Sequence, residues 1–213
     1  QFFPRYTLRS NIPLRRLNMQ VQSSAYFPSL AYVGALLQDP HLVLDFKEHF
    51  VKQSIRTRAE ILSANGVIQL NVPIIHTAHK QTLEDIQIDY SKNWQAEHWR
   101  AIESAYANAP HFEHYAHDLR ALFAQQPAYV HELNQLILEW INTALDLQLK
   151  LEWSETYTGQ TDSDKKAWMG RDLNPTKAYQ QVFSNKAGFV RNLSVLDGLM
   201  NEGPLLRCHF LPR

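Results

Sequence analysis

Hydrophobic residues recur at helical spacing in several stretches of the chain. The clearest stretch covers residues 94–115, where a proline divides the apolar pattern. Pro110 disfavours helical dihedral angles at Ala109 and has no backbone N–H to donate, so we expect one helix to end there and a second to begin. The longest helix is expected at about residues 128–147, because its apolar positions follow the helical period.

Two shorter helices have recognisable ends. Ser29 can cap a helix that must end before Pro40, because a proline disfavours helical geometry at the residue before it. Asn192 or Ser194 can cap a final helix that ends at Gly203. Each helix carries an apolar stripe, which indicates that one face packs on a core.

Short apolar runs between the helices indicate strands. We expect strands over residues 19–24, 41–46, 86–88 and 149–153. Asn65 and Gly66 form a strong two-residue hairpin signal, so the segments on either side of them should pair in antiparallel fashion. The pattern predicts a single α/β domain, with α+β as the alternative, in which a mixed β-sheet with an antiparallel hairpin packs against several amphipathic helices.

Composition narrows the class of protein. The 213 residues are 45% hydrophobic, and Lys and Arg together equal Asp and Glu at 21 each, so general electrostatic binding to nucleic acid is not expected. The single cysteine, Cys208, excludes an internal disulfide and fits a reducing compartment. No apolar run approaches the roughly 20 residues of a membrane span, and we expect a cytoplasmic protein.

The first 18 residues differ from the remainder. They contain four arginines and no acidic residue, without an apolar stripe, and Met19 follows them directly. We therefore interpret residues 1–18 as a non-native or flexible basic extension and expect the domain to begin at Met19.

Histidines are the first candidates for metal chemistry. His111, His114 and His117 are spaced three apart and could share a ligand. The apolar positions of the same helix occupy its buried face, which turns these histidines toward solvent, so we expect no metal and no cofactor. His98 is expected to be a surface or hydrogen-bonded structural histidine. The chain also lacks the glycine motifs of a P-loop or a nucleophile elbow.

A row of cations is the remaining candidate. In an extended strand Lys52, Arg56 and Arg58 would share one face, because side chains alternate with a two-residue period. Arginine presents a planar fork that suits phosphate or carboxylate oxygens, so the row can form an anion site. The alternative is a solvated strand face paired with acids across the hairpin. Both interpretations stay open.

Several separated blocks give the chain a family resemblance. They are residues 25–28, residues 50–54 with Arg58, Asn65 and Gly66 with residues 72–73, residues 94–115, residues 179–183, residues 193–197 and residues 201–204. In this order they resemble the WbqC-like proteins, and the likeness is greatest to the Bacteroidetes-type branch. Ile55 and Thr57 depart from the family pattern. The family's usual helical, acidic ending is missing after Pro204, so residues 19–204 make the expected domain and residues 205–213 an atypical tail.

The resemblance implies a biological context. WbqC-like proteins are linked with gene clusters for O-antigen, capsule and other bacterial surface polysaccharides, but no mechanism can be transferred. One hypothesis is a transferase acting on a sugar-nucleotide or amino-sugar substrate. A second is a non-catalytic binding or scaffold protein in the same pathway. A nucleic-acid-binding module is least favoured, because the net charge is zero.

The candidate site combines the cations with the strand ends. Ligands bind at the carboxyl ends of α/β strands, where loops and helix N-termini leave donors free. We therefore expect Asp45 to act as a base or bind a sugar hydroxyl, and Tyr26 to orient the ligand. Lys52, Arg58 and Arg56 would bind a small anionic or sugar-nucleotide ligand, under a loop at residues 154–178. The alternative is that Asp45 neutralises Lys52 or Arg58 in a structural salt bridge.

Overall fold

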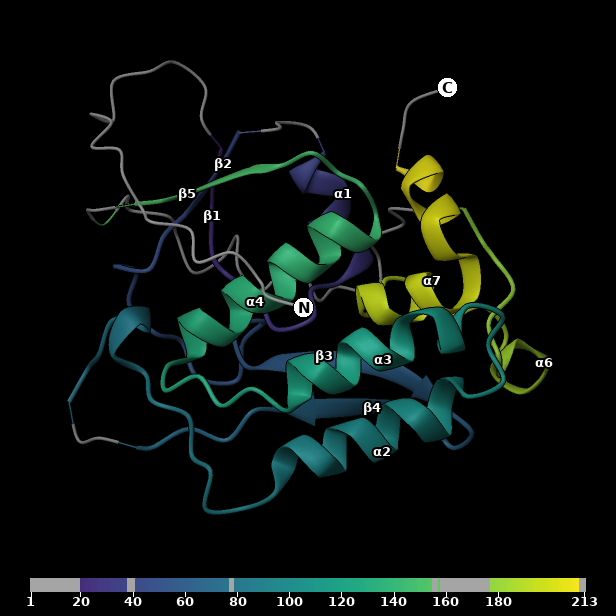
Figure 1. Ribbon diagram of the computed structural model, residues 1–213, viewed down its shortest axis with the longest axis horizontal. Helices are drawn as coiled ribbons and strands as arrows, with labels where there is room; N and C mark the ends of the chain where they lie inside the picture. Colours follow the sequence, from purple (N-terminus) through teal and green to yellow (C-terminus); the bar gives the residue numbers. More distant parts are fainter. Residues whose placement is uncertain (1–19, 38–40, 77–78, 155–156, 158–176, 211–213) are drawn as a thin grey trace.

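The strands form two small sheets. The computed structural model describes residues 20–37, 41–76, 79–154, 157 and 177–210. β1 (Gln20–Gln22), β2 (His41–Leu44) and β5 (Lys150–Trp153) form a parallel sheet in the order β1-β2-β5. β3 (Arg58–Ser63) and β4 (Gly66–Asn71) form a separate antiparallel hairpin (Figure 1). The single α/β domain is confirmed.

The sequence led us to expect one mixed sheet, but the parallel strands and the antiparallel hairpin form two separate sheets. One reason is visible at β3, where the backbone N–H of Ser194 donates to the carbonyl of Glu60 at 2.8 Å. A segment from the end of the chain therefore occupies this edge. The expected hairpin is confirmed, but its two turn residues are Ala64 and Asn65, because Ser63 pairs directly with Gly66, the first residue of β4, whose φ is 105°.

The helices follow the apolar patterns closely. The described helices are α1 (Leu30–Leu36), η1 (Leu83–Asp85), α2 (Trp94–Tyr106), α3 (Phe112–Phe123), α4 (Val130–Ala144), α6 (Ser184–Ala187), α7 (Val195–Glu202) and η2 (Gly203–His209). Ser29 caps α1 by accepting from the backbone N–H of Tyr32, and Ser194 caps α7 by accepting from that of Leu196. The corner around Pro110 is confirmed, although α2 already ends at Tyr106.

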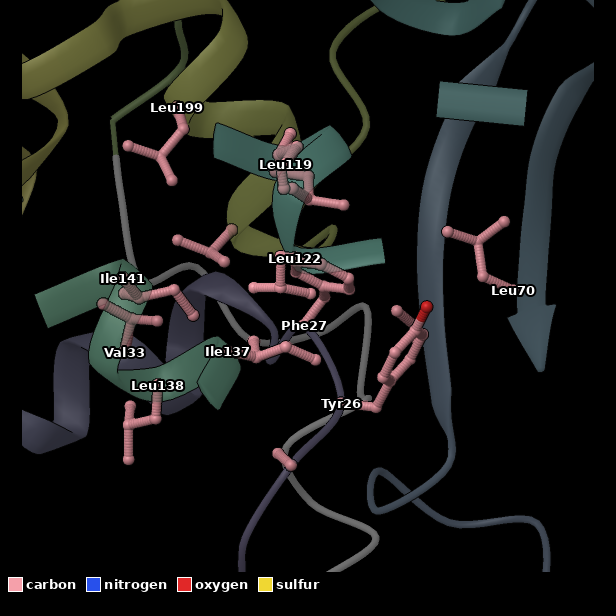
Figure 2. Packing of buried hydrophobic residues seen from close by; sticks show 14 of the residues in the cluster. Tyr26, Phe27, Val33, Leu70, Leu119, Leu122, Ile137, Leu138, Ile141 and Leu199 are labelled. Carbon is pink, nitrogen blue, oxygen red and sulfur yellow. The ribbon is translucent and has the colours of Figure 1, made fainter. Parts of the chain in front are cut away.

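One hydrophobic core joins the elements. Figure 2 shows side chains from α1, α3, α4 and α7 gathered around Phe27, which is fully buried. Phe27 has a φ of 36°, in the left-handed region that a bulky residue rarely adopts. In the view of Figure 1, α4 lies between the parallel sheet and the hairpin. Its Asn134 amide donates to Ser24 Oγ at 3.1 Å and to the carbonyl of Arg56 at 3.0 Å, which links both sides.

The described part of the chain packs on the core as far as Phe210. Leu206 is 0% exposed and Phe210 is 9% exposed, so these residues of the expected tail belong to the folded domain. A Cβ on Gly198 would lie 2.7 Å from Leu206 Cδ1, which explains why glycine stands at this close approach. The expected extension at residues 1–18 and most of the expected loop at 154–178 lie outside the described residues.

Candidate functional site

Three polar residues lie side by side at the carboxyl end of the parallel sheet. Ser23, Asp45 and Ser154 follow directly after β1, β2 and β5. The ladder continues through them, because Asp45 N–H donates to the Gln22 carbonyl at 3.0 Å and Ser154 N–H donates to the Leu44 carbonyl at 2.9 Å. Their exposed fractions are 2%, 0% and 7%. We call Ser23, Asp45 and Ser154 the polar row.

A buried ion pair supports the polar row. Arg56 Nε lies 2.5 Å from Glu48 Oε1, and both side chains are 0% exposed. The other guanidinium nitrogens donate to Ser54 Oγ at 3.0 Å and Ser23 Oγ at 3.2 Å. Ser23 in turn donates to Glu48 Oε2 at 2.8 Å. The charges of Arg56 and Glu48 are thus satisfied inside the protein, and breaking this network would leave an uncompensated buried charge.

The expected row of cations on one strand face is wrong. Residues 52–57 form turns, and β3 begins only at Arg58. The turn is held where Thr57 N–H donates to the Ser54 carbonyl at 3.2 Å, and Gln53 has a φ of 56°. Lys52 is therefore exposed, Arg56 is buried and Arg58 is half-buried, so the three side chains occupy three different environments.

Asp45 lies at the predicted strand end, but sequence reasoning missed the acid of the ion pair. Asp45 accepts a hydrogen bond from the backbone N–H of Lys47 at 2.9 Å. The carboxylate that pairs with the arginine belongs to Glu48, three residues farther along. A signal was present, because Glu48 is the only acid between Asp45 and Glu60 and directly precedes the cationic segment.

Tyr26 and His98 form a buried pair. The Tyr26 hydroxyl lies 2.7 Å from His98 Nδ1, and the two side chains are 0% and 6% exposed. Burial lowers the pKa of His98 to about 4, while its hydrogen bond to the Asn71 backbone opposes that shift. The imidazole is therefore neutral near pH 7 and accepts from Tyr26. His98 is therefore a hydrogen-bonded structural histidine, which is one of the two alternatives that we expected from the sequence.

A second polar cluster surrounds Asp197. This carboxylate is 1% exposed and accepts from the hydroxyls of Tyr106 and Tyr179 and from Gln181 Nε2, at 3.0, 2.6 and 2.7 Å. Burial raises the pKa of Asp197, because desolvation outweighs these three hydrogen bonds. Sequence reasoning gave Asp197 no role, since its partners are far apart along the chain.

The three clustered histidines lie on and before α3. His114 and His117 are exposed, and His111 is half-buried beside Gly203. Within the described ranges, no group of three or more His, Cys, Asp or Glu side chains is arranged to hold a metal ion. In the same part of the chain, no helix combines the length and apolar character that a membrane span requires.

Comparison with known proteins places the chain in a family. It is 28% identical over 134 residues to the uncharacterised protein Rv1507c of Mycobacterium tuberculosis, a match that covers 62% of this chain and 55% of that protein. No solved structure matches the chain significantly. The sequence pattern of the WbqC-like protein family matches residues 22–174, which is more than half of the chain. The chain therefore belongs to the WbqC-like protein family.

Proposed function

We propose that this chain acts in the biosynthesis of bacterial surface polysaccharide, O-antigen or capsule, as a transferase on a sugar-nucleotide or amino-sugar substrate. The family resemblance supports the pathway, and membership in the Bacteroidetes-type branch and a cytoplasmic location are parts of the same proposal. The substrate would be a small anionic ligand bound at the carboxyl end of the parallel sheet.

The polar row is the observation that carries this proposal. Parallel α/β sheets bind ligands outside the carboxyl ends of their strands, because the loops that follow can direct polar groups to one place. Here all three strands end in a short polar residue, Ser23, Asp45 or Ser154, in one register. A buried ion pair fixes the first of them. This arrangement favours recognition of hydroxyl and phosphate oxygens over an apolar ligand.

Backbone strain beside the polar row supports the same location. Phe27 has a φ of 36° and Gln53 a φ of 56°, and both values are unfavourable for residues with a side chain. Their loops meet where the backbone N–H of Tyr26 donates to the Ile55 carbonyl at 2.8 Å. Strained residues of this kind concentrate at functional sites, where surrounding contacts hold them in place.

The side chains divide into two roles in this proposal. Lys52 is exposed and Arg58 is half-buried, so they are the cations that can reach a phosphate. Asp45 binds a sugar hydroxyl or acts as a base. Arg56 and Tyr26, both 0% exposed and bonded to Glu48 and His98, hold the loops in position from the inside.

Titration calorimetry with a panel of sugar nucleotides tests the proposal. Lys52→Ala and Arg58→Ala should each weaken binding, whereas Lys92→Ala removes an exposed lysine elsewhere and should leave it unchanged. Each variant should keep the unfolding temperature of the wild type to within a few degrees. If the wild type binds no member of the panel, the proposal fails.

A non-catalytic binding protein in the same pathway is the second candidate. The observation in its favour is the burial of Asp45, which is 0% exposed and accepts from the backbone of Lys47. Asp45→Asn keeps an oxygen for that backbone bond but removes the base. If the chain is a transferase that uses this base, the variant should bind the sugar nucleotide and lose product formation. An unchanged rate would exclude Asp45 as the base.

A further inference from the structure

Aromatic side chains form a stack beside the polar row. Trp153, the last residue of β5, stacks on Phe46 with ring centroids 4.7 Å apart and 21° between the planes. Phe46 also contacts the ring of His131 at 4.8 Å. All three side chains are half-buried. We call Trp153, Phe46 and His131 the aromatic stack.

The aromatic stack and the polar row are neighbours in sequence at the ends of the same two strands, β2 and β5. Phe46 directly follows Asp45, and Trp153 directly precedes Ser154. His131 lies in the first turn of α4, which begins on the same side of the molecule as the end of β5 (Figure 1). The aromatic stack therefore lies, like the polar row, at the carboxyl end of the parallel sheet.

Backbone hydrogen bonds hold the stack in place. The N–H groups of Glu84 and Leu83 donate to the carbonyls of Phe46 and Glu48, at 3.0 and 2.9 Å, which ties the loop after β2 to η1. The Val130 N–H donates to the Ile86 carbonyl at 2.9 Å and fixes the start of α4 to the neighbouring segment. A surface that is ordered before binding loses little conformational entropy when a ligand arrives.

One polar atom of the stack has no partner. His131 Nδ1 is buried from solvent and makes no hydrogen bond within the part of the chain that the structure describes. Such atoms are rare in folded proteins, because burying a polar group without a partner is costly. Small-molecule sites are lined mainly by hydrophobic and aromatic side chains with a small number of polar groups, and the stack has this composition.

We propose that the aromatic stack binds the nucleobase of a nucleotide sugar. This inference rests on the proposed function, in which the exposed and half-buried cations hold the phosphates and the polar row holds the sugar. A nucleobase is flat and can stack on an aromatic ring such as that of the half-buried Trp153.

Calorimetry with dissected ligands tests this assignment. The panel contains nucleotide sugars of uracil, thymine, cytosine and guanine, and the tightest one is then compared with its free nucleoside diphosphate and its sugar 1-phosphate. Trp153→Leu should weaken the binding of the nucleotide sugar and of the nucleoside diphosphate by about 5- to 150-fold, as expected for the loss of one base–aromatic stack. The affinity for the sugar 1-phosphate should not change.

Control variants separate binding from folding. Trp99→Leu makes the same change at a half-buried tryptophan that packs against Phe112 and Arg120, and it should bind like the wild type. Phe46→Leu nearly keeps the volume of the stack and provides a second variant if Trp153→Leu does not fold. Circular dichroism and the unfolding temperature report folding in each case.

The outcomes distinguish this inference from the proposed function. If the Trp153 and Phe46 variants bind the nucleotide sugar as tightly as the wild type, while Lys52→Ala and Arg58→Ala bind it weakly, the stack is not the base site and the proposed function stands. An equal loss of affinity for the sugar 1-phosphate would also overturn the base assignment. Failure of the wild type to bind any nucleotide sugar would overturn both.

Discussion

Acidification should destabilise the protein through His98. In the folded state burial favours the neutral imidazole, and its two ring nitrogens are engaged with the Tyr26 hydroxyl and the Asn71 backbone. The folded pKa of His98, about 4, lies below its ordinary value of 6.5. As pH falls, His98 is therefore protonated in the unfolded chain before it is protonated in the folded protein. The stabilisation that the neutral His98 provides is present above the ordinary pKa and is lost as pH falls through the folded pKa.

The size of the effect follows from the pKa shift. The difference between the ordinary 6.5 and the folded value of about 4 corresponds to about 3 kcal/mol of unfolding free energy, at roughly 1.4 kcal/mol per pKa unit. Most of it should already be lost at about pH 4.5. This is a large fraction of the typical stability of a domain, which is about 5–15 kcal/mol.

Urea unfolding at a series of pH values measures the loss. The wild type should lose more stability than His98→Gln between about pH 7.5 and pH 4.5, because the variant has no proton to bind at this position. Taking the difference between the two proteins removes the contributions of all other titrating groups. His114→Gln, at an exposed histidine, is the matched control and should parallel the wild type. Parallel curves for wild type and His98→Gln would refute the reasoning.

Three further substitutions test the packing of the domain. Glu48→Ala leaves the buried Arg56 charge unpaired and should cost about 3–5 kcal/mol in urea unfolding; a cost below about 1 kcal/mol would contradict the buried pair. Leu206→Ala should cost about 2–5 kcal/mol, whereas Leu205→Ala, at a side chain 65% exposed, should cost little, and equal effects would show that this segment does not pack as described. Burial raises the folded pKa of Asp197 above its ordinary 3.8. The protonated carboxyl therefore contributes its full stabilisation at low pH, and this stabilisation is lost as pH rises through the folded pKa. The stability of Asp197→Asn should therefore increase relative to that of the wild type as pH rises from about 4 to 7. An unchanged difference in unfolding free energy between the two proteins would exclude a raised pKa.

Elements that depend on local chemistry could be predicted from the sequence. α1 and α7 begin where Ser29 and Ser194 can cap them, and the β3–β4 hairpin forms at the Asn65–Gly66 signal, with Gly66 as the first residue of β4. α4 was expected because its apolar period persists over its whole length. In each case the determining residues are neighbours along the chain, so a short window of sequence contains the whole signal.

The candidate site depends on contacts that no such window contains. The two-residue alternation that placed Arg56 and Arg58 on one face assumes extended backbone, but the Tyr26 N–H bond to the Ile55 carbonyl joins a loop near the start of the chain to a turn at residues 52–57. Once that turn forms, Arg56 points into the protein, where the fold brings Ser23 and Glu48 to meet it. The cations that looked equivalent in sequence then separate into Arg56, which is buried in an ion pair, and Lys52 and Arg58, which are exposed and half-buried. For this reason Arg58→Ala and Glu48→Ala should differ in kind: the first should reduce ligand affinity at little cost in stability, and the second should unfold the protein at lower urea.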